Sequence, residues 1–342
     1  MFREDGGDVG AYAIKRFLTI VPVLIGISLI VFSFIHLIPG DPAVAMLGER
    51  ATPQRVAEVR AQLGLDRPLY IQYSIYVGKI LRGDFGASIL RGDPVLRDLV
   101  RRFPATVELA TSAILIAILV GVPMGIISAV WRNSLFDGAS RLIALTGVSM
   151  PIFWLGLMLA WFFGVVLGWL PTGFRLGTEV TLAPVTNFYI LDSLLTRNPA
   201  ALASSLRHLI LPAVALSTIP MAVIARMTRA SLLEVLSQEY IRTAEAKGLP
   251  QAAVILRHAM RNALLPVMTV TGLQVGRLLA GAILTETIFS WPGIGLWIFE
   301  SIQARDYPIV QGATLFIATI FVMVNLLTDV LYAAVDPRIK YD

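Results

Sequence analysis

Long apolar runs alternate with polar segments along this chain of 342 residues. Six of the runs reach about twenty residues, the length that a helix needs to cross the hydrocarbon core of a bilayer. We therefore predict six membrane-spanning helices in an all-α integral membrane protein. Their expected positions are 17–37, 105–130, 139–168, 208–227, 264–289 and 309–333.

The charged residues beside the apolar runs predict how the chain is oriented. Lys15 and Arg16 come directly before the first run, and basic residues gather on the cytoplasmic side of membrane proteins. The N-terminal segment 1–16 is therefore expected in the cytoplasm, and six crossings return the tail 336–342 to the same side. The first run is too long for a cleavable signal and is expected to remain as an anchor.

Composition supports a membrane protein and removes several kinds of chemistry. Apolar residues make up 56% of the chain and charged residues 15%, whereas soluble domains are nearer half and a quarter. The chain has no Cys, which excludes disulfides and thiolate sites. It has three His and no P-loop, HExxH or GxSxG sequence, so we expect no catalytic site, no metal site and no cofactor bound by the chain itself.

The polar segments divide the chain further. Residues 38–104 carry both signs of charge and two amphipathic helical patterns, at 55–63 and 69–81, and predict a periplasmic subdomain. Two further external loops are expected at 170–207 and 290–308. The remaining part, 105–335, is expected to form a core of five helices with one large cytoplasmic loop, 229–263.

The cytoplasmic loop is polar and basic in a chain that is otherwise mostly apolar. Apolar residues before and after Gly248 have the three-and-four spacing of a helix face: Leu233, Leu236, Tyr240 and Ala244, then Ala253, Val254, Leu256 and Ala259. Between them, Gly248-Leu249-Pro250 interrupts the pattern, because Gly accepts left-handed backbone and Pro cannot continue the helical hydrogen bonds. We predict a helix, a tight turn and a second helix that another protein grips.

Two other interpretations fit this loop less well. A DNA-binding helix-turn-helix would need room to enter a groove, but membrane spans begin within a few residues of each end. A basic helix lying on anionic lipid would gain nothing from the Gly-Leu-Pro break. The net charge of +5 is therefore attributed to membrane topology rather than to nucleic acid.

Within the spans, Arg277 is the unusual residue, because a cation at that depth costs about 2.5–3.5 kcal/mol on insertion scales. It is expected to face the bundle interior or water, either as a pathway residue that meets a substrate carboxylate or in a structural pair with Asp329. Gln274, three residues earlier, would extend the same pathway face. Near the inner end of the fourth span, Arg226 and Arg229 are expected to reach the lipid surface.

Several sequence blocks occur in an order that resembles a known family. They are IPGDP (38–42), QLGLD (62–66), GDFGAS (83–88), SMPIFW (149–154), RTAEAKG (242–248), HAMRNALLPV (258–267), ILTETIFSWPGIG (283–295) and RDYPIVQG (305–312). The block at 242–248 resembles the cytoplasmic Glu-Ala-Ala-x-x-x-Gly signature of binding-protein-dependent ABC importer permeases. Ala244 and Gly248 match it, whereas Arg242 and Thr243 depart from it in a way that resembles the peptide and nickel subfamily, closest to dipeptide importers.

The resemblance implies the type I permease fold of ABC importers and a set of partners. The chain would be a multi-pass protein of the bacterial inner membrane that pairs with a second, homologous permease. Two cytoplasmic ATPase subunits would bind ATP, and a periplasmic binding protein would deliver dipeptides or oligopeptides. A coupling helix around 244–253, with its turn at Gly248, would enter an ATPase cleft. The residues that the resemblance assigns to this contact are Arg242, Ala244, Glu245, Lys247, Gly248, Leu249 and Gln251.

Other functions stay open at this point. An importer of the same class for glutathione, nickel chelates or another small solute would have the same sequence pattern. A secondary transporter driven by an ion gradient would favour inverted repeats and buried carboxylates at the midplane, neither of which is clear here. A membrane-embedded enzyme is the weakest alternative, because the catalytic residue sets are missing.

Overall fold

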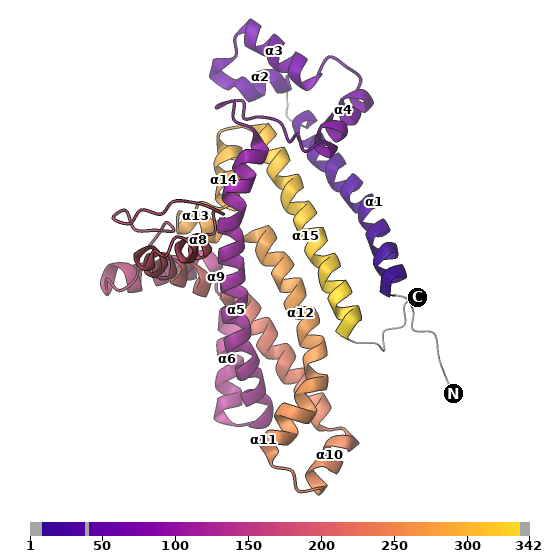
Figure 1. Ribbon diagram of the computed structural model, residues 1–342, viewed down its shortest axis with the longest axis vertical. Coiled ribbons are helices and arrows are strands. Elements are labelled where there is room, and N and C mark those ends of the chain that lie inside the picture. Colours follow the sequence, from indigo (N-terminus) through magenta and orange to yellow (C-terminus); the bar gives the residue numbers. More distant parts are fainter. Residues whose placement is uncertain (1–8, 38–40, 336–342) are drawn as a thin grey trace.

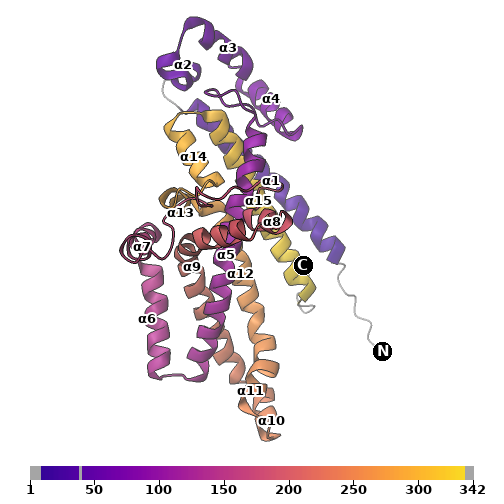
Figure 2. The same ribbon diagram turned by 60° about the vertical axis from the view of Figure 1, so that its left-hand side comes forward.

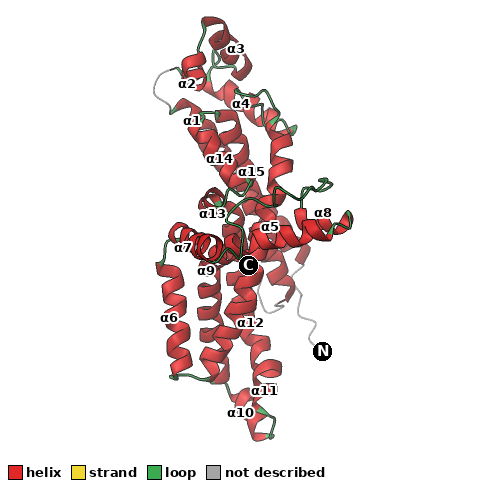
Figure 3. Cartoon of the chain, turned by 90° about the vertical axis from the view of Figure 1, so that its left-hand side faces the viewer, coloured by secondary structure: helices red, strands yellow, loops and turns green. Residues whose placement is uncertain are grey.

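The computed structural model describes residues 9–37 and 41–335, and all regular structure in these ranges is helical (Figure 3). A single isolated β-bridge joins Ala87 to Pro94, and no strand forms in the described part of the chain. The all-α prediction is therefore confirmed. The predicted tail 336–342 and the first eight residues of the N-terminal segment lie outside the described residues.

The helices follow one another with short connections, apart from the loops at residues 82–94 and 167–188. In chain order they are α1 (Val9–His36), α2 (Pro42–Leu47), a 3₁₀ turn (Gly48–Arg50), α3 (Pro53–Leu63), α4 (Leu69–Leu81), α5 (Val95–Val130), α6 (Leu135–Ser149), α7 (Ile152–Leu159), a π-helix (Ala160–Val166), α8 (Tyr189–Leu195), α9 (Pro199–Leu236), α10 (Glu239–Ala246), α11 (Gln251–Ala253), a second π-helix (Val254–Ala259), α12 (Met260–Gly281), α13 (Ile283–Ile288), α14 (Ile294–Gln303) and α15 (Tyr307–Val335).

The elements form an elongated bundle with a cap at each end. α5, α12 and α15 lie side by side along its long axis, and α1 flanks α15 (Figure 1). α2, α3 and α4 form the cap at one end, and α10 with α11 lies at the opposite end (Figure 1). The bundle therefore separates the predicted periplasmic subdomain from the predicted cytoplasmic loop by its whole length.

The central packing contact is between α5 and α9, and two glycines make it close. A Cβ atom on Gly121 would lie 2.8 Å from the Met221 carbonyl oxygen, and one on Gly125 would lie 2.5 Å from Cβ of Thr228. Such distances leave no room for a side chain, so the two helix backbones approach closely, as small residues at this spacing allow. Around them, Leu109, Ala113, Leu216 and other buried apolar side chains form the main core.

Among the described residues, three helices are long and apolar enough to cross a membrane unaided: α5, α9 and the portion Tyr307–Thr328 of α15. The pair formed by α6 and Ile152–Val166 passes the same test as one bent unit. In α1, the apolar stretch Thr19–Phe34 is shorter than a full span. The apolar runs thus coincide with helices, but the lengths differ from the predicted ones.

The third predicted span, 139–168, is not one straight helix. α6 and α7 meet at an angle of 103° at Pro151, and α7 crosses the end of α6 (Figure 2). Met150 has extended backbone, with ψ of 130°, because the ring of a following proline disfavours the helical region. Pro151, near the middle of the predicted span, therefore separates two helices.

The fifth predicted span, 264–289, is also divided. α12 ends at Gly281, and α13 begins after Ala282. The following segment, predicted as an external loop at 290–308, instead contains α14, with Trp291 and Trp297 each only 1% exposed. This part of the chain is packed core rather than loop.

A buried carboxylate organises the segment from α13 to α14. Glu286 accepts hydrogen bonds from the Thr106 hydroxyl of α5 at 2.7 Å and from the Leu296 amide at 2.9 Å. The second bond satisfies a free amide in the first turn of α14, and a carboxylate is favoured at that helix end. Trp291 adds a bond from its indole nitrogen to the Ala105 carbonyl, 2.8 Å long. The segment is therefore fastened to α5 at neighbouring residues.

The long loop before α9 is held by two buried acidic residues. Arg175, 4% exposed, forms an ion pair with Glu108 of α5 and lies 3.7 Å from the ring centre of Tyr189. Asp192 accepts bonds from the Thr186 hydroxyl at 2.6 Å and from three backbone amides, at Val185, Thr186 and Asn187. The loop is thus ordered by hydrogen bonds to charged groups, not by an apolar core of its own.

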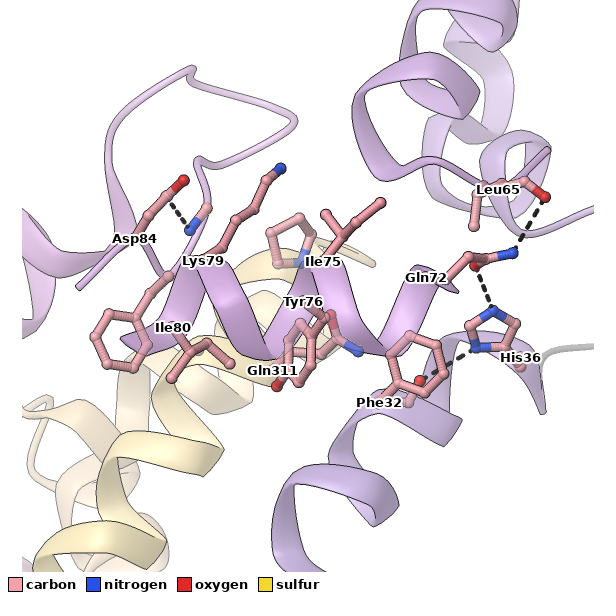
Figure 4. A pocket seen from close by; sticks show the side chains of 14 residues that line it. Phe32, His36, Leu65, Gln72, Ile75, Tyr76, Lys79, Ile80, Asp84 and Gln311 are labelled. Carbon is pink, nitrogen blue, oxygen red and sulfur yellow. Dashed lines mark hydrogen bonds between the residues drawn. The ribbon is translucent and has the colours of Figure 1, made fainter. Parts of the chain in front are cut away.

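The end cap connects to the bundle through polar contacts. Ser88 donates a hydrogen bond to Asp306, which precedes α15, and His36 at the end of α1 bonds to Gln72 of α4 at 3.0 Å (Figure 4). The boundary predicted at residue 104 does not coincide with a structural one. α5 begins at Val95, so its first turns project beyond the predicted second span towards the cap.

Candidate coupling site

The segment predicted to bind a partner lies at the tip of the bundle, where α9 ends and α10 follows it (Figure 1). The apolar pattern from Leu233 to Ala244 was expected to follow one helix. Instead, α9 ends at Leu236, Ser237 and Gln238 form a break, and α10 begins at Glu239. The chain therefore turns away from the bundle axis before the predicted turn is reached.

α10 is anchored by its apolar side. Ile241 is 1% exposed, and Ala244 is also buried. Both belong to a cluster that joins five elements, which are α5, α9, α10, the second π-helix and α12. Its buried members are Ala129, Leu232, Val235, Ile241, Ala244, Val254, Ile255, Ala259, Met260 and Ala263. Next to these residues, Tyr240 accepts a hydrogen bond of 2.8 Å from the Asn262 side chain. α10 is thus attached to α9 and α12 without being continuous with either.

The turn after α10 has the backbone that the sequence predicts. Gly248 has a φ of +75°, the left-handed region that favours glycine, and its amide bonds to the Glu245 carbonyl at 2.9 Å. No atom lies within 4 Å of the position that a Cβ would occupy. Pro250 then precedes α11, and its carbonyl accepts bonds from Ala253 and Val254. Gly248 is therefore required for backbone conformation rather than for packing.

The second helix of the site is irregular. A π-helix follows α11, and its buried residues Val254 and Ala259 are five positions apart, the spacing of π-type hydrogen bonds. Leu256 was expected on the same apolar face, but it is 65% exposed. The wider turn rotates this side chain outwards, which a pattern search with the α-helical period misses.

The structure separates the seven predicted contact residues into two groups. Six of them are exposed at the tip: Arg242, Glu245, Lys247, Gly248, Leu249 and Gln251. Ala244 is 7% exposed and faces the chain's own cluster, so it anchors the site and does not form its surface. The segment 244–253, predicted as a coupling helix with its turn at Gly248, consists of the end of α10, a turn, and α11.

An ion pair next to the site was missed from the sequence. Arg229 near the end of α9 binds Asp137 of α6 through two bonds of 2.9 Å, from Nε to Oδ1 and from Nη2 to Oδ2. Asp137 is fully buried and also accepts bonds from the Ser128 hydroxyl at 2.6 Å and the Asn133 amide at 3.0 Å. Arg229 was expected to reach the lipid surface, but it joins α9 to α6 and to the end of α5.

The two predicted pathway residues lie on different surfaces of α12. Gln274 is 3% exposed inside the bundle, whereas Arg277 is exposed on the outside. Residues three apart differ by only about 60° around a helix, so the edge of the surface that neighbouring helices cover passes between these two side chains. No ion pair forms at Arg277 among the described side chains, and the side chain of Asp329 is outside them. Arg277 does not face this chain's interior.

A bundle of apolar helices, several of them long enough to cross a bilayer, is typical of a multi-pass membrane protein. The chain belongs to the family described as binding-protein-dependent transport system inner membrane component, which matches residues 121–341. The corresponding N-terminal family matches residues 10–110.

Curated relatives cover almost the whole chain. The dipeptide transport system permease protein DppB of Alkalihalophilus pseudofirmus is 52% identical over 331 residues, which are 97% of this chain and 99% of that protein. DppB of Escherichia coli is 49% identical, covering 96% and 98%. The glutathione transport system permease protein GsiC of Salmonella choleraesuis is 42% identical, covering 96% and 99%.

A solved structure has the same fold. A chain of the MetNI methionine ABC transporter, in an inward-facing conformation, matches with a TM-score of 0.50 and 16% identity. The match covers 70% of this chain and 96% of the MetNI chain. The shared fold is that of an ABC importer permease.

Proposed function

We propose that the chain is the permease subunit of an ATP-driven importer that moves dipeptides or oligopeptides into the cytoplasm. The observation that carries this proposal is the near-complete match to DppB proteins at about half identity. The anchored tip supports it, because a permease without an ATP site needs a firm attachment to the subunit that hydrolyses ATP.

The proposed topology has six crossings with both ends in the cytoplasm of a bacterium, in the inner membrane. The bent pair α6–α7 provides one crossing, and α12 with α13 provides another. The cap of α2, α3 and α4 then lies outside, and the tip with α10 lies inside. Basic residues on the tip, including Arg242 and Lys247, fit the cytoplasmic side.

In the proposed assembly, two ATPase subunits dock on the cytoplasmic side, and one of them holds the tip of this chain. The six exposed residues of the tip would form the contact. Ala244 and Ile241 would transmit force into the bundle, because they join α10 to α9 and α12. The Asp137–Arg229 pair would extend the rigid base to α6.

A second, homologous permease would complete the translocation path, and a periplasmic binding protein would deliver the peptide. Arg277 fits this arrangement, since an exposed cation in an apolar helix must meet water or another chain. Its guanidinium would attract a peptide carboxylate in a path between the two permeases. Gln274, buried inside the bundle, is better placed to support α12 than to touch substrate.

A substitution at the turn tests the coupling role. In Gly248→Arg, the chain should insert normally but lose ATP-dependent uptake, because an L-residue is strained at this φ and a bulky cation occupies the contact. Gly248→Asn is the matched control, since Asn tolerates left-handed backbone, and it should retain most uptake. Full uptake by Gly248→Arg, with ATPase subunits copurifying normally, would defeat the assignment.

Glutathione is the second candidate substrate, because GsiC covers the chain nearly as completely as DppB does. Uptake of a labelled dipeptide and of labelled glutathione can be compared in cells that lack their own transporters for both. Excess unlabelled dipeptide should abolish dipeptide uptake, and glutathione should not. Uptake of glutathione alone would replace the peptide proposal.

A further inference from the structure

The helix α4 in the end cap buries a polar residue and exposes large apolar side chains at its two ends. Of its 13 residues, Gln72 is the buried one. Leu69, Tyr70 and Leu81 are 58%, 74% and 82% exposed. In a cap surrounded by water this would be the reverse of the usual arrangement, in which apolar side chains leave water.

The inward position of Gln72 is fully satisfied. Its amide nitrogen donates to the carbonyls of Leu65 and Arg67, and its oxygen pairs with a ring nitrogen of His36 at 3.0 Å (Figure 4). These contacts determine which side of α4 faces the bundle. The apolar exposure is therefore a consequence of defined polar contacts and not of a loosely placed helix.

The neighbouring helix α3 has the opposite character. Its sequence, PQRVAEVRAQL, carries three charged residues, and its exposed positions include Gln54, Arg55 and Glu58. α4, LYIQYSIYVGKIL, carries one. Two helices of one small cap thus have surfaces suited to different surroundings, water for α3 and an apolar medium for α4.

The contacts between α4 and α1 show how far along the apolar helix α1 the helix α4 lies. Tyr73 shares a hydrogen bond of 2.8 Å with Ser28, and the Phe32 ring lies 5.4 Å from the Tyr73 ring and 5.7 Å from the Tyr76 ring. Ser28 and Phe32 lie within the apolar stretch Thr19–Phe34 of α1. Ser28 is two turns, or about 12 Å, below His36 along that helix. α4 is therefore level with the outer part of an apolar membrane helix.

We propose that α4 lies in the outer leaflet of the bilayer, with Leu69, Tyr70 and Leu81 against phospholipid. Helices of this kind lie in the plane of the interface, with their apolar side among the acyl chains and polar side chains towards the head groups. Three tyrosines along α4 suit this depth, because aromatic residues with a polar end are enriched there. Arg82, exposed at the C-terminal end, suits contact with lipid phosphate.

The space behind α4 agrees with this placement. A pocket between α1, α4 and the start of α15 is lined mainly by apolar side chains, among them Phe32, Ile75 and Ile80 (Figure 4). The Tyr76 hydroxyl is buried without a hydrogen-bond partner in the described residues. Polar side chains also line this pocket, among them Gln72 and Gln311, so the contact of α4 with the bundle is mixed, whereas its most exposed side chains are large and apolar.

The inference rests on the proposed crossing by α1, and spin labels test the two separately. The chain has no Cys, so single cysteines can be introduced and labelled without removing others. Tyr70→Cys reports on α4, Ile30→Cys on the lipid-facing side of α1, and Gln54→Cys on α3; all three native side chains are exposed. Leu81→Cys is a second position on α4. The full chain is reconstituted in phospholipid nanodiscs, and collisions with oxygen and with a polar nickel chelate are compared.

Oxygen concentrates in the bilayer, and the nickel chelate stays in water. Labels at 30, 70 and 81 should collide several-fold more with oxygen than with nickel, and the label at 54 should show the reverse. If labels at 70 and 81 resemble that at 54 while 30 remains in lipid, the proposal is overturned and the apolar face is left for a protein partner. If the label at 30 also reports water, the proposed crossing by α1 fails, and the proposal fails with it.

Discussion

Replacing Ile241 by Ala should detach α10 from the bundle without altering the exposed tip. Ile241 is 1% exposed within the cluster that joins α10 to α9 and α12. The change removes three buried carbons, worth about 0.8 kcal/mol each, or about 2.4 kcal/mol before any cavity cost. Measured Ile→Ala changes in cores lie at about 2–5 kcal/mol, so this is a lower limit.

The loss should appear as faster local opening of α10. Since every 1.4 kcal/mol is a factor of ten, about 2.4 kcal/mol raises the open population roughly fiftyfold. Hydrogen exchange of the α10 amides should accelerate by that factor, while exchange in the middle of α5 stays unchanged. In the assembled transporter, ATP hydrolysis should continue and uptake per ATP should fall.

Thr243→Ala is the matched control. Thr243 lies on the same helix two residues away, but its side chain is exposed. It should leave exchange and uptake close to those of the unchanged protein. The reasoning is refuted if Ile241→Ala leaves exchange in α10 unchanged, or if exchange accelerates and uptake per ATP does not fall.

Three further changes probe other parts of the chain. Arg277→Gln should weaken uptake of free peptides more than of C-terminally amidated ones; equal loss for both would leave only a structural role. Burial alone would raise the pKa of Asp192, but the hydroxyl and amide groups that donate to its carboxylate outweigh burial and lower the pKa. The loop that Asp192 holds should therefore be fully ordered at neutral pH and should lose this order as the pH falls below about 4. Asp192→Asn should remove this dependence, measured by hydrogen exchange in the loop; an identical acid transition in the variant would exclude Asp192 as its cause. Gly125→Leu should force α5 away from α9, because even a Cβ atom would lie 2.5 Å from Thr228, and should lower the free energy of unfolding in denaturant by more than about 1–3 kcal/mol. Gly138→Leu is the control, because no atom lies within 4 Å of the position of its Cβ. Equal stability of the two variants would contradict close packing of α5 and α9.

Much of the helix content was predictable because lipid imposes a simple requirement. In lipid, the backbone N–H and C=O groups of each apolar run must form hydrogen bonds within the run itself, so each run forms helix. The bend at Pro151 was not predictable in the same way, since a proline in a membrane helix can be accommodated or can end it. The decision depends on what the next segment packs against, and α7 packs against α9 and α13.

The part of the candidate site that could be predicted is the turn, because backbone conformation alone determines it. Gly248 and Pro250 specify a turn by themselves, and the turn is present. The inward direction of Ala244 depends on where α9 ends, and that break has no strong local signal. The pairing of Arg229 with Asp137 joins residues 92 positions apart and leaves no trace in a periodic pattern. The roles of the exposed tip residues stay predictions.

The length of α5 has a mechanical consequence. Its 36 residues form one helix about 54 Å long, from the cap to the base beside α10. In its half nearer the cap, Thr106 binds Glu286 and Glu108 accepts a bond from the Ile190 amide, and near the other end Ser128 binds Asp137. A tilt of about 5° at the base would displace the far end by about 5 Å, the size of one helical turn. In the proposed topology, α5 would therefore act as a lever arm that converts a small rotation on the cytoplasmic side into a larger displacement on the outer side.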